Sequence, residues 1–329
     1  MLTIAIIAIA AFIITFFFTY ILTNISISYL KRKDLTVKDY HKPGEVRIPM
    51  PGGPAIVIPI LVVEIIIYIL TQDIRVISLI LTVVMVFIIG IVDDFYRLSG
   101  VVKPTLLILG SLPIIILKTY NPYVTFPLFG TVRLTILYPI LVLIAITITS
   151  NTINTIDVLN GVVSGFSMIA TIPIIFALIL KADYTAFIFT LPLLASLLAF
   201  YIYHRYPSKI FPGDSGSLSI GAMYGAITIL GGVEIVGVVA LLPAILNSFL
   251  FLSSVKRLIE HREIKERPVI ILEDYRLAAS VNPSAPITLV RLILADGPLN
   301  ESEIVREIFK LAIFTMVLAL ITAYITWGL

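Results

Sequence analysis

The chain has 329 residues, of which 59% are hydrophobic and 13% are charged, and its formal net charge is +3. Soluble domains carry roughly 25% charged residues, so this composition excludes a soluble fold. The small net charge gives no indication of nucleic-acid binding, and the absence of cysteine excludes disulfides. We expect an all-α polytopic membrane protein, residues 1–329 forming one transmembrane domain, with no nucleic acid as partner.

Apolar runs along the chain predict ten membrane spans. Each reaches or approaches the roughly 20 residues that cross about 30 Å of hydrocarbon. The first run lacks a basic leading region and a clear cleavage site, so we interpret it as a retained span. In chain order, the predicted spans are 2–30, 54–71, 75–92, 103–119, 134–151, 160–181, 184–204, 215–231, 233–254 and 304–328.

The loops between these spans indicate an orientation. Most of the 23 lysines and arginines fall in the odd-numbered loops, which places those loops in the cytoplasm and both termini outside. Residues 120–133 predict a short outside hairpin with Pro and Gly at its turn. Residues 255–303 predict a long cytoplasmic loop, a small α/β-like region with a strand at "PVIIL" and a helix-compatible segment at "EDYRLAA".

One apolar run ends on paired acids in "VDDFYRLSGVVK", which contains Asp93, Asp94 and Lys103. Polar residues often end a span, and that is the simplest interpretation. However, acids at a membrane edge are costly unless they are used. A cation at a fixed distance would relieve the repulsion between the two carboxylates.

Two more polar motifs fall on the same predicted side. In "SNTINTIDVLNG", Asn151, Asn154, Asp157 and Asn160 recur every three residues, which predicts a stripe along one helix face. Carboxylate and amide oxygens are ligands that Mg²⁺ prefers. In "FPGDSGS", Asp214 lies between glycines, where it is either a helix N-cap or a ligand-binding acid.

Two basic segments also lie on this side. They are "LKRKDLTVKDYHKPGEVRIPMPGG", which contains Asp39 and Lys42, and "EHREIKERP", which contains His261 and Arg262. Each is separately explained as a solvated charge run, although arginine suits phosphate recognition because its planar fork donates two hydrogen bonds. Metal-binding oxygens and phosphate-binding cations at one membrane face together indicate phosphoryl transfer.

These motifs resemble those of the polyprenyl-phosphate N-acetylhexosamine-1-phosphate transferase superfamily, glycosyltransferase family 4. The resemblance covers nearly the whole chain. The segments "EHREIKERP" and "NPSAPITLVRLILADGPLNESEIV" resemble the archaeal and eukaryotic type, which uses UDP-GlcNAc and dolichyl phosphate. A histidine-rich element of the bacterial translocase branch is absent from the sequence.

The resemblance implies a role for each matching residue. It implies Mg²⁺ as cofactor, with Mn²⁺ as a substitute, and a nucleotide sugar and a lipid phosphate as substrates. The implied sets are Asp93, Asp94 and Lys103 for catalysis; Asn154 and Asp214 for the metal; Asp39, Asn160, Phe211, His261 and Arg262 for the nucleotide sugar; and Lys103 and Asn151 for the lipid phosphate.

The resemblance implies transfer of GlcNAc-1-phosphate from UDP-GlcNAc to dolichyl or polyprenyl phosphate, giving GlcNAc-PP-lipid and UMP. This would be the first step of lipid-linked oligosaccharide assembly for N-glycosylation, at the cytoplasmic face of the cell membrane. Open alternatives are another UDP-sugar, undecaprenyl phosphate as carrier, and a secondary transporter. A one-step or covalent mechanism and a homodimer also stay open.

Three positions depart from the eukaryotic pattern. Glu260 stands where that pattern has an arginine, which puts the diphosphate contact there in doubt and leaves open whether Lys265 or Arg267 replaces it. Met50 stands where the pattern has an acid, which puts one nucleotide contact in doubt. Asp157 fits the translocase branch better.

Overall fold

Apolar runs rich in Ile, Leu and Val form the long helices of the computed structural model, which describes residues 2–42, 44–256 and 266–328. The long helices are α1 Leu2–Arg32, α2 Gly53–Thr71, α3 Ile74–Tyr96, α6 Leu137–Ile156, α7 Val162–Leu180, α8 Tyr184–His204, α9 Gly213–Gly231 and α13 Glu301–Trp327. Shorter helical elements are α4 Val102–Leu107, η1 Ile108–Ser111, α5 Leu112–Ile116, α10 Glu234–Ala240, α11 Leu242–Val255, α12 Leu289–Ile293 and η3 Leu294–Asp296.

The long helices confirm a multi-pass membrane protein. Among the described residues, seven helices are long and apolar enough to span a membrane: α1, α2, α3, α6, α7, α8 and α13. The bent pair α10 and α11 would make an eighth span. Ten spans with both termini outside therefore stay a prediction.

Two predicted spans are not continuous helices. The run 233–254 breaks at Leu241, and α10 and α11 meet there at 68°. Pro243 lies in the first turn of α11, where it has no N–H to continue the hydrogen bonding of α10. The run 103–119 divides into α4, η1 and α5.

Helix α9 is enclosed by other helices. Every residue from Ser215 to Gly231 is buried. A Cβ on Gly53 of α2 would lie 2.5 Å from Gly216 N, and one on Gly221 would lie 2.6 Å from Ser150 Cα of α6. Small residues permit this close packing, as in many membrane helix pairs. They also lower the hydropathy of α9, so this helix is not among the seven.

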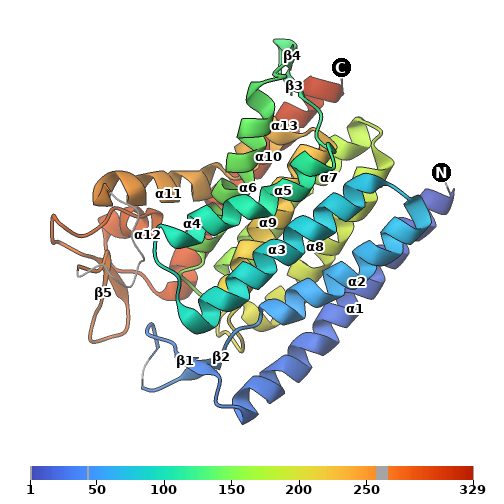
Figure 1. The fold of residues 1–329 in the computed structure, drawn as a ribbon. Coiled ribbons are helices and arrows are strands. Elements are labelled where there is room, and N and C mark those ends of the chain that lie inside the picture. Colours follow the sequence, from blue (N-terminus) through green and yellow to red (C-terminus); the bar gives the residue numbers. More distant parts are fainter. Residues whose placement is uncertain (1, 43, 257–265, 329) are drawn as a thin grey trace.

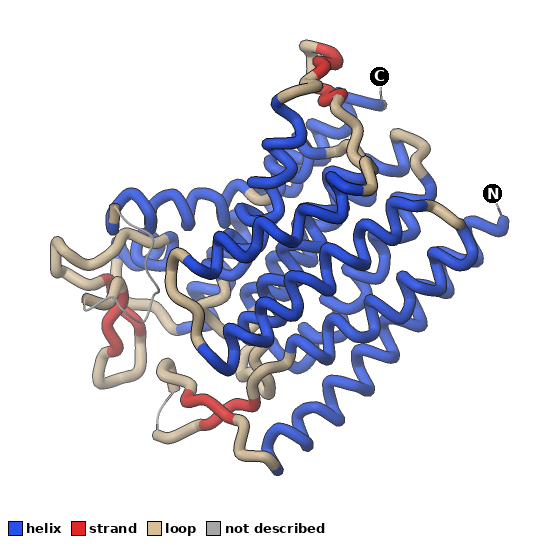
Figure 2. Tube along the Cα trace, viewed as in Figure 1, coloured by secondary structure: helices blue, strands red, loops and turns tan. Residues whose placement is uncertain are grey.

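Three short antiparallel ribbons lie outside the bundle (Figure 2). The strands are β1 Thr36–Lys38 with β2 Arg47–Pro49, β3 Tyr123–Phe126 with β4 Gly130–Arg133, and β5 Val269–Ile271 with β6 Leu277–Ala279. The hairpin predicted at 120–133 and the strand predicted in "PVIIL" are confirmed. A helix at "EDYRLAA" is wrong, because Tyr275 has φ +63° and turns the chain into β6.

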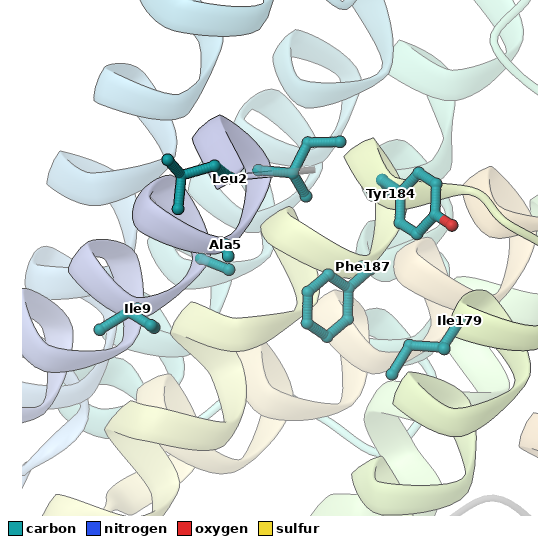
Figure 3. A pocket seen from close by; sticks show the side chains of 8 residues that line it. Leu2, Ala5, Ile9, Ile179, Tyr184 and Phe187 are labelled. Atoms are coloured by element: carbon teal, nitrogen blue, oxygen red, sulfur yellow. The ribbon is translucent and has the colours of Figure 1, made fainter.

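The two ends of the bundle differ. Both termini and the β3–β4 ribbon lie at one end, and β1–β2 and β5 lie at the other (Figure 1). At the end with the N-terminus, α1, α7 and α8 line an open apolar hollow of about 570 Å³ beside Leu2, Phe187 and Tyr184 (Figure 3). None of the described residues that line this hollow is charged, so the polar motifs of the sequence lie elsewhere.

Candidate active site

The turn after α3 brings Lys103 onto Asp93. α3 continues through both aspartates to Tyr96, beyond the boundary predicted at residue 92. Asp93 Oδ1 accepts a hydrogen bond from the backbone N–H of Leu98 at 2.7 Å, which holds the turn against the helix. Lys103 lies on α4, and its Nζ is 2.5 Å from Asp93 Oδ2. The spacing in the sequence thus becomes a buried ion pair.

The first turn of α9 approaches the same ion pair. Gly213 begins α9 with φ +70°, a conformation that favours glycine. The next residue, Asp214, has its Oδ1 3.1 Å from Lys103 Nζ. Lys103 therefore lies between the carboxylates of Asp93 and Asp214, and these three charges sum to −1.

Asp94 contacts the backbone of α9. Its Oδ1 accepts a hydrogen bond from the N–H of Asp214 at 2.7 Å, and its Oδ2 accepts one from the N–H of Ser215 at 3.0 Å. These N–H groups have no partner within a helix, and a negative charge at a helix N-terminus is favourable. The two adjacent aspartates thus have different environments.

The C-terminal end of α6 reaches the same turn of α9. Ser217 Oγ, one turn into α9, donates to Asn154 Oδ1 at 2.7 Å. This hydrogen bond places Asn154, near the end of α6, against the start of α9, the helix that carries Asp214. Asn151 instead donates its Nδ2 to the carbonyl of Thr147 at 2.9 Å, which holds its amide along α6.

The predicted helical stripe is wrong beyond Asn154. α6 ends at Ile156, Asp157 leaves helical backbone with ψ 64°, and Asn160 lies in the turn that follows. Asp157 is nevertheless close enough to the site for the charge of Asp214 to act on it. Burial and the negative charge of Asp214 raise the pKa of Asp157 to about 8.

A second polar cluster joins the loop after α1 to three other segments. Lys42 Nζ lies 2.7 Å from Asp39 Oδ2 and donates to Asn160 Oδ1 at 2.9 Å. Asn160 Nδ2 donates to Asp39 Oδ2 at 3.3 Å, and Asn160 Oδ1 also accepts from Ser208 N–H at 2.7 Å. The backbone N–H of Asn160 donates to Glu301 Oε1 at 2.7 Å. We name these five residues the Asn160 cluster.

The Asn160 cluster brings two predicted nucleotide residues together, Asp39 and Asn160. Asn160 is 2% exposed, and its amide is hydrogen-bonded inside the cluster. In this structure it therefore ties chain segments together. Phe211 lies between β2 and α9, donating its N–H to Pro49 O at 2.9 Å and accepting from Gly52 N–H at 2.8 Å.

One further group of metal-capable side chains is present among the described residues. Ligand atoms of Asp39, His41 and Glu301 lie within 4.8 Å of one another. Burial lowers the pKa of His41 below its ordinary value of 6.5, which favours the neutral imidazole. The Lys42 ammonium lies 2.7 Å from Asp39, much as Lys103 lies between Asp93 and Asp214.

Sequence reasoning missed Ser208, Ser217 and Glu301. The serines act through single hydrogen bonds, and their residue type carries no signal. Glu301 gave no distinct signal either, because an acid in the first turn of a helix is already explained by the favourable charge there. The predicted residues His261 and Arg262, with Glu260 and Lys265, lie outside the described residues.

Comparisons with known proteins agree with this geometry. A model of glycosyl transferase family 4 matches residues 76–232, which contain Asp93, Asp94, Lys103, Asn154 and Asp214. A protein of Saccharolobus solfataricus, provisionally named UDP-N-acetylglucosamine–dolichyl-phosphate N-acetylglucosaminephosphotransferase, is 33% identical over 226 residues, which are 67% of this chain and 70% of that protein. A protein of Sulfolobus acidocaldarius with the same provisional name is 26% identical over 324 residues, 95% of each chain.

A bacterial protein is also similar. The phospho-N-acetylmuramoyl-pentapeptide-transferase of Prochlorococcus marinus is 33% identical over 198 residues, 55% of each chain. A helical membrane bundle with a charged cluster at one end, matched to these proteins, defines a membrane-embedded transferase. The chain belongs to glycosyl transferase family 4.

Proposed function

We propose that the chain transfers GlcNAc-1-phosphate from UDP-GlcNAc to dolichyl or another polyprenyl phosphate, giving GlcNAc-PP-lipid and UMP. The names of the archaeal relatives support these substrates. The observation that carries the proposal is Lys103 held between Asp93 and Asp214 at the end of a membrane bundle. There a lipid phosphate and a water-soluble nucleotide sugar can meet, and an ammonium can bind phosphate oxygens.

The donor set where α6 meets α9 fits Mg²⁺, with Mn²⁺ as a substitute. Asp214 of α9 offers a carboxylate oxygen and Asn154 of α6 offers an amide oxygen, and hard cations prefer oxygen ligands. The charge of −1 around Lys103 also favours a cation. When bound, the ion would polarise the diphosphate and stabilise the charge on the leaving UMP.

The chain's own residues have separate tasks in the proposed reaction. Lys103 binds phosphate oxygens, and this weakens its contact with Asp93. The released Asp93 carboxylate takes the remaining proton of the lipid phosphate or orients it. A lipid phosphate oxygen then bonds to the sugar-linked phosphorus, the bond from that phosphorus to the UMP oxygen breaks, and UMP leaves with the electron pair. The covalent alternative makes Asp93 or Asp94 the attacking group.

The proposal also includes a location. The basic segments after α1 and around β5 would face the cytoplasm, where nucleotide sugars are made, and the product would begin a lipid-linked oligosaccharide for N-glycosylation. A homodimer is compatible with the proposal.

The test is UMP release by the purified protein with UDP-GlcNAc, dolichyl phosphate and Mg²⁺. We expect activity that EDTA abolishes and Mn²⁺ partly restores, and Asp214→Asn should lose at least roughly 100-fold while keeping its unfolding temperature. UDP-GalNAc, UDP-MurNAc-pentapeptide and undecaprenyl phosphate are the comparison substrates. Preference for the pentapeptide substrate would contradict the proposal and support the function named for the Prochlorococcus relative.

The same assay separates the two mechanisms. A chiral sugar-linked phosphorus should invert its configuration in one step and retain it in two. Trapping a GlcNAc-phosphoryl group on Asp93 or Asp94 would contradict direct attack.

A further inference from the structure

Helix α9 begins without a capping side chain of its own. Its N-cap position is Pro212, and no side chain of the N-cap makes a capping hydrogen bond. The first N–H groups of a helix need a partner, and a buried helix end without one is destabilised. The two oxygens of Asp94, from α3, bind the N–H groups of Asp214 and Ser215.

The backbone around this contact contains glycines where a side chain would not fit. A Cβ on Gly213 would lie 2.6 Å from Asp94 Oδ1. A Cβ on Gly90, one turn before Asp94 on α3, would lie 2.5 Å from Ser215 Cα. α3 is therefore docked directly onto the first turn of α9.

We propose that Asp94 is a positioning residue that caps α9 from another helix and thereby aims Asp214 at Lys103. This deepens the proposed function and rests on it. The cap ties the backbone of Asp214 to α3, the helix that also carries Asp93. Asp93 and Asp214 are thereby held on either side of Lys103, at 2.5 and 3.1 Å from its Nζ.

Two substitutions break the cap in different ways. Asp94→Asn removes the charge and leaves one oxygen for two N–H groups. Gly213→Ala leaves Asp94 intact but adds a methyl group where its carboxylate lies. The control is Gly130→Ala, because Gly130 also has a positive φ, +80°, but has nothing within 4 Å of the added Cβ, so it reports backbone strain alone.

The expected kinetic result is non-additivity. Asp94→Asn and Gly213→Ala should each lower kcat by roughly 10- to 100-fold, because each weakens charge-assisted hydrogen bonds. The kcat of the double variant should be within about threefold of that of the worse single variant, because both substitutions remove the same contact between Asp94 and α9. Gly130→Ala should stay within about twofold of wild type. A double variant whose loss equals the product of the single losses would overturn the proposal, as would a nearly normal Gly213→Ala beside an inactive Asp94→Asn.

Two more measurements separate positioning from general loss of structure. The Mg²⁺ concentration for half-maximal rate should rise in both variants, whereas a merely structural defect lowers the rate at an unchanged Mg²⁺ requirement. Hydrogen exchange should accelerate in a peptide covering residues 211–217 in both variants and not in Gly130→Ala. Unchanged exchange in Asp94→Asn would refute the cap even if the protein showed no transferase activity, and an inactive wild type would refute only the proposed function.

Discussion

At the scale of single residues, two side chains of the same type can have different partners in the folded chain. Asp93 and Asp94 are neighbours of the same type, yet one faces a lysine and the other faces the start of a helix. The motif predicted that these acids and Lys103 lie together. It did not predict their division of tasks, because the partners of Asp94 lie 120 residues or more along the chain.

Asn160 shows the same limit. Its residue type and its spacing from Asn154 indicated a ligand contact. Its actual partners, Asp39, Lys42 and Ser208, come from segments whose meeting only the folded chain specifies.

The ion pair of Lys103 leads to a stability prediction. Lys103→Met leaves Asp93 buried without its cation, and breaking a buried pair in this way costs about 3–5 kcal/mol. The double variant Asp93→Asn, Lys103→Met should recover most of this loss in the free energy of unfolding. It should not recover UMP release. Denaturant unfolding in detergent micelles measures the first quantity.

A surface ion pair gives the matched control. Lys38 lies 4.0 Å from Glu45 in the β1–β2 loop region, outside the predicted spans, and the two side chains are 43% and 87% exposed. Lys38→Met should therefore change stability by less than about 1 kcal/mol. If Lys103→Met were equally mild, the buried charges near it would not depend on the lysine.

At the scale of elements, the apolar runs predicted the helices well where lipid or a neighbouring helix covers them uniformly. The span predicted at 184–204 coincides with α8 Tyr184–His204. The errors occur where local chemistry overrides hydropathy. Pro243 divides one apolar run into α10 and α11, and Asp157 leaves the helix before the predicted polar stripe is complete.

Helix α2 carries an acid that gives a prediction at this scale. Glu64 is 1% exposed, and neither of its carboxylate oxygens has a hydrogen-bond partner among the described residues. Burial of a polar group without a partner is costly, so Glu64→Met should raise the free energy of unfolding by about 1–3 kcal/mol. Transferase activity should be unchanged, because Glu64 lies well along α2 from the site.

Glu234 is the matched control for Glu64. It begins α10 and accepts a hydrogen bond from the hydroxyl of Tyr138. Glu234→Met leaves that buried hydroxyl without its acceptor and should lower stability by about 1–3 kcal/mol. The same sign of change in both variants would show that an unseen partner satisfies Glu64.

At the scale of the whole molecule, the candidate site residues gather at one end of the bundle. The candidate catalytic residues and the Asn160 cluster lie where α3 and α6 end and α9 and α13 begin. Helices that run in opposite directions thus present their termini to the same membrane face. A periodic sequence pattern identifies each helix, but the convergence of these ends depends on the direction of every preceding span.

This arrangement predicts which residues face which side of the membrane. The chain has no cysteine, so single cysteines can be labelled without background. Tyr40 and Val281 lie at the end of the bundle that holds the site, and they are 72% and 93% exposed. Phe129 lies in the β3–β4 turn at the opposite end and is 87% exposed. Each is replaced by cysteine in a separate variant: Tyr40→Cys, Val281→Cys and Phe129→Cys. In intact cells, a membrane-impermeant maleimide should label only Phe129→Cys, and all three should react in opened membranes. Labelling of Tyr40→Cys and Val281→Cys from outside would reverse the proposed orientation, because the active site would then face away from the cytoplasmic nucleotide sugar.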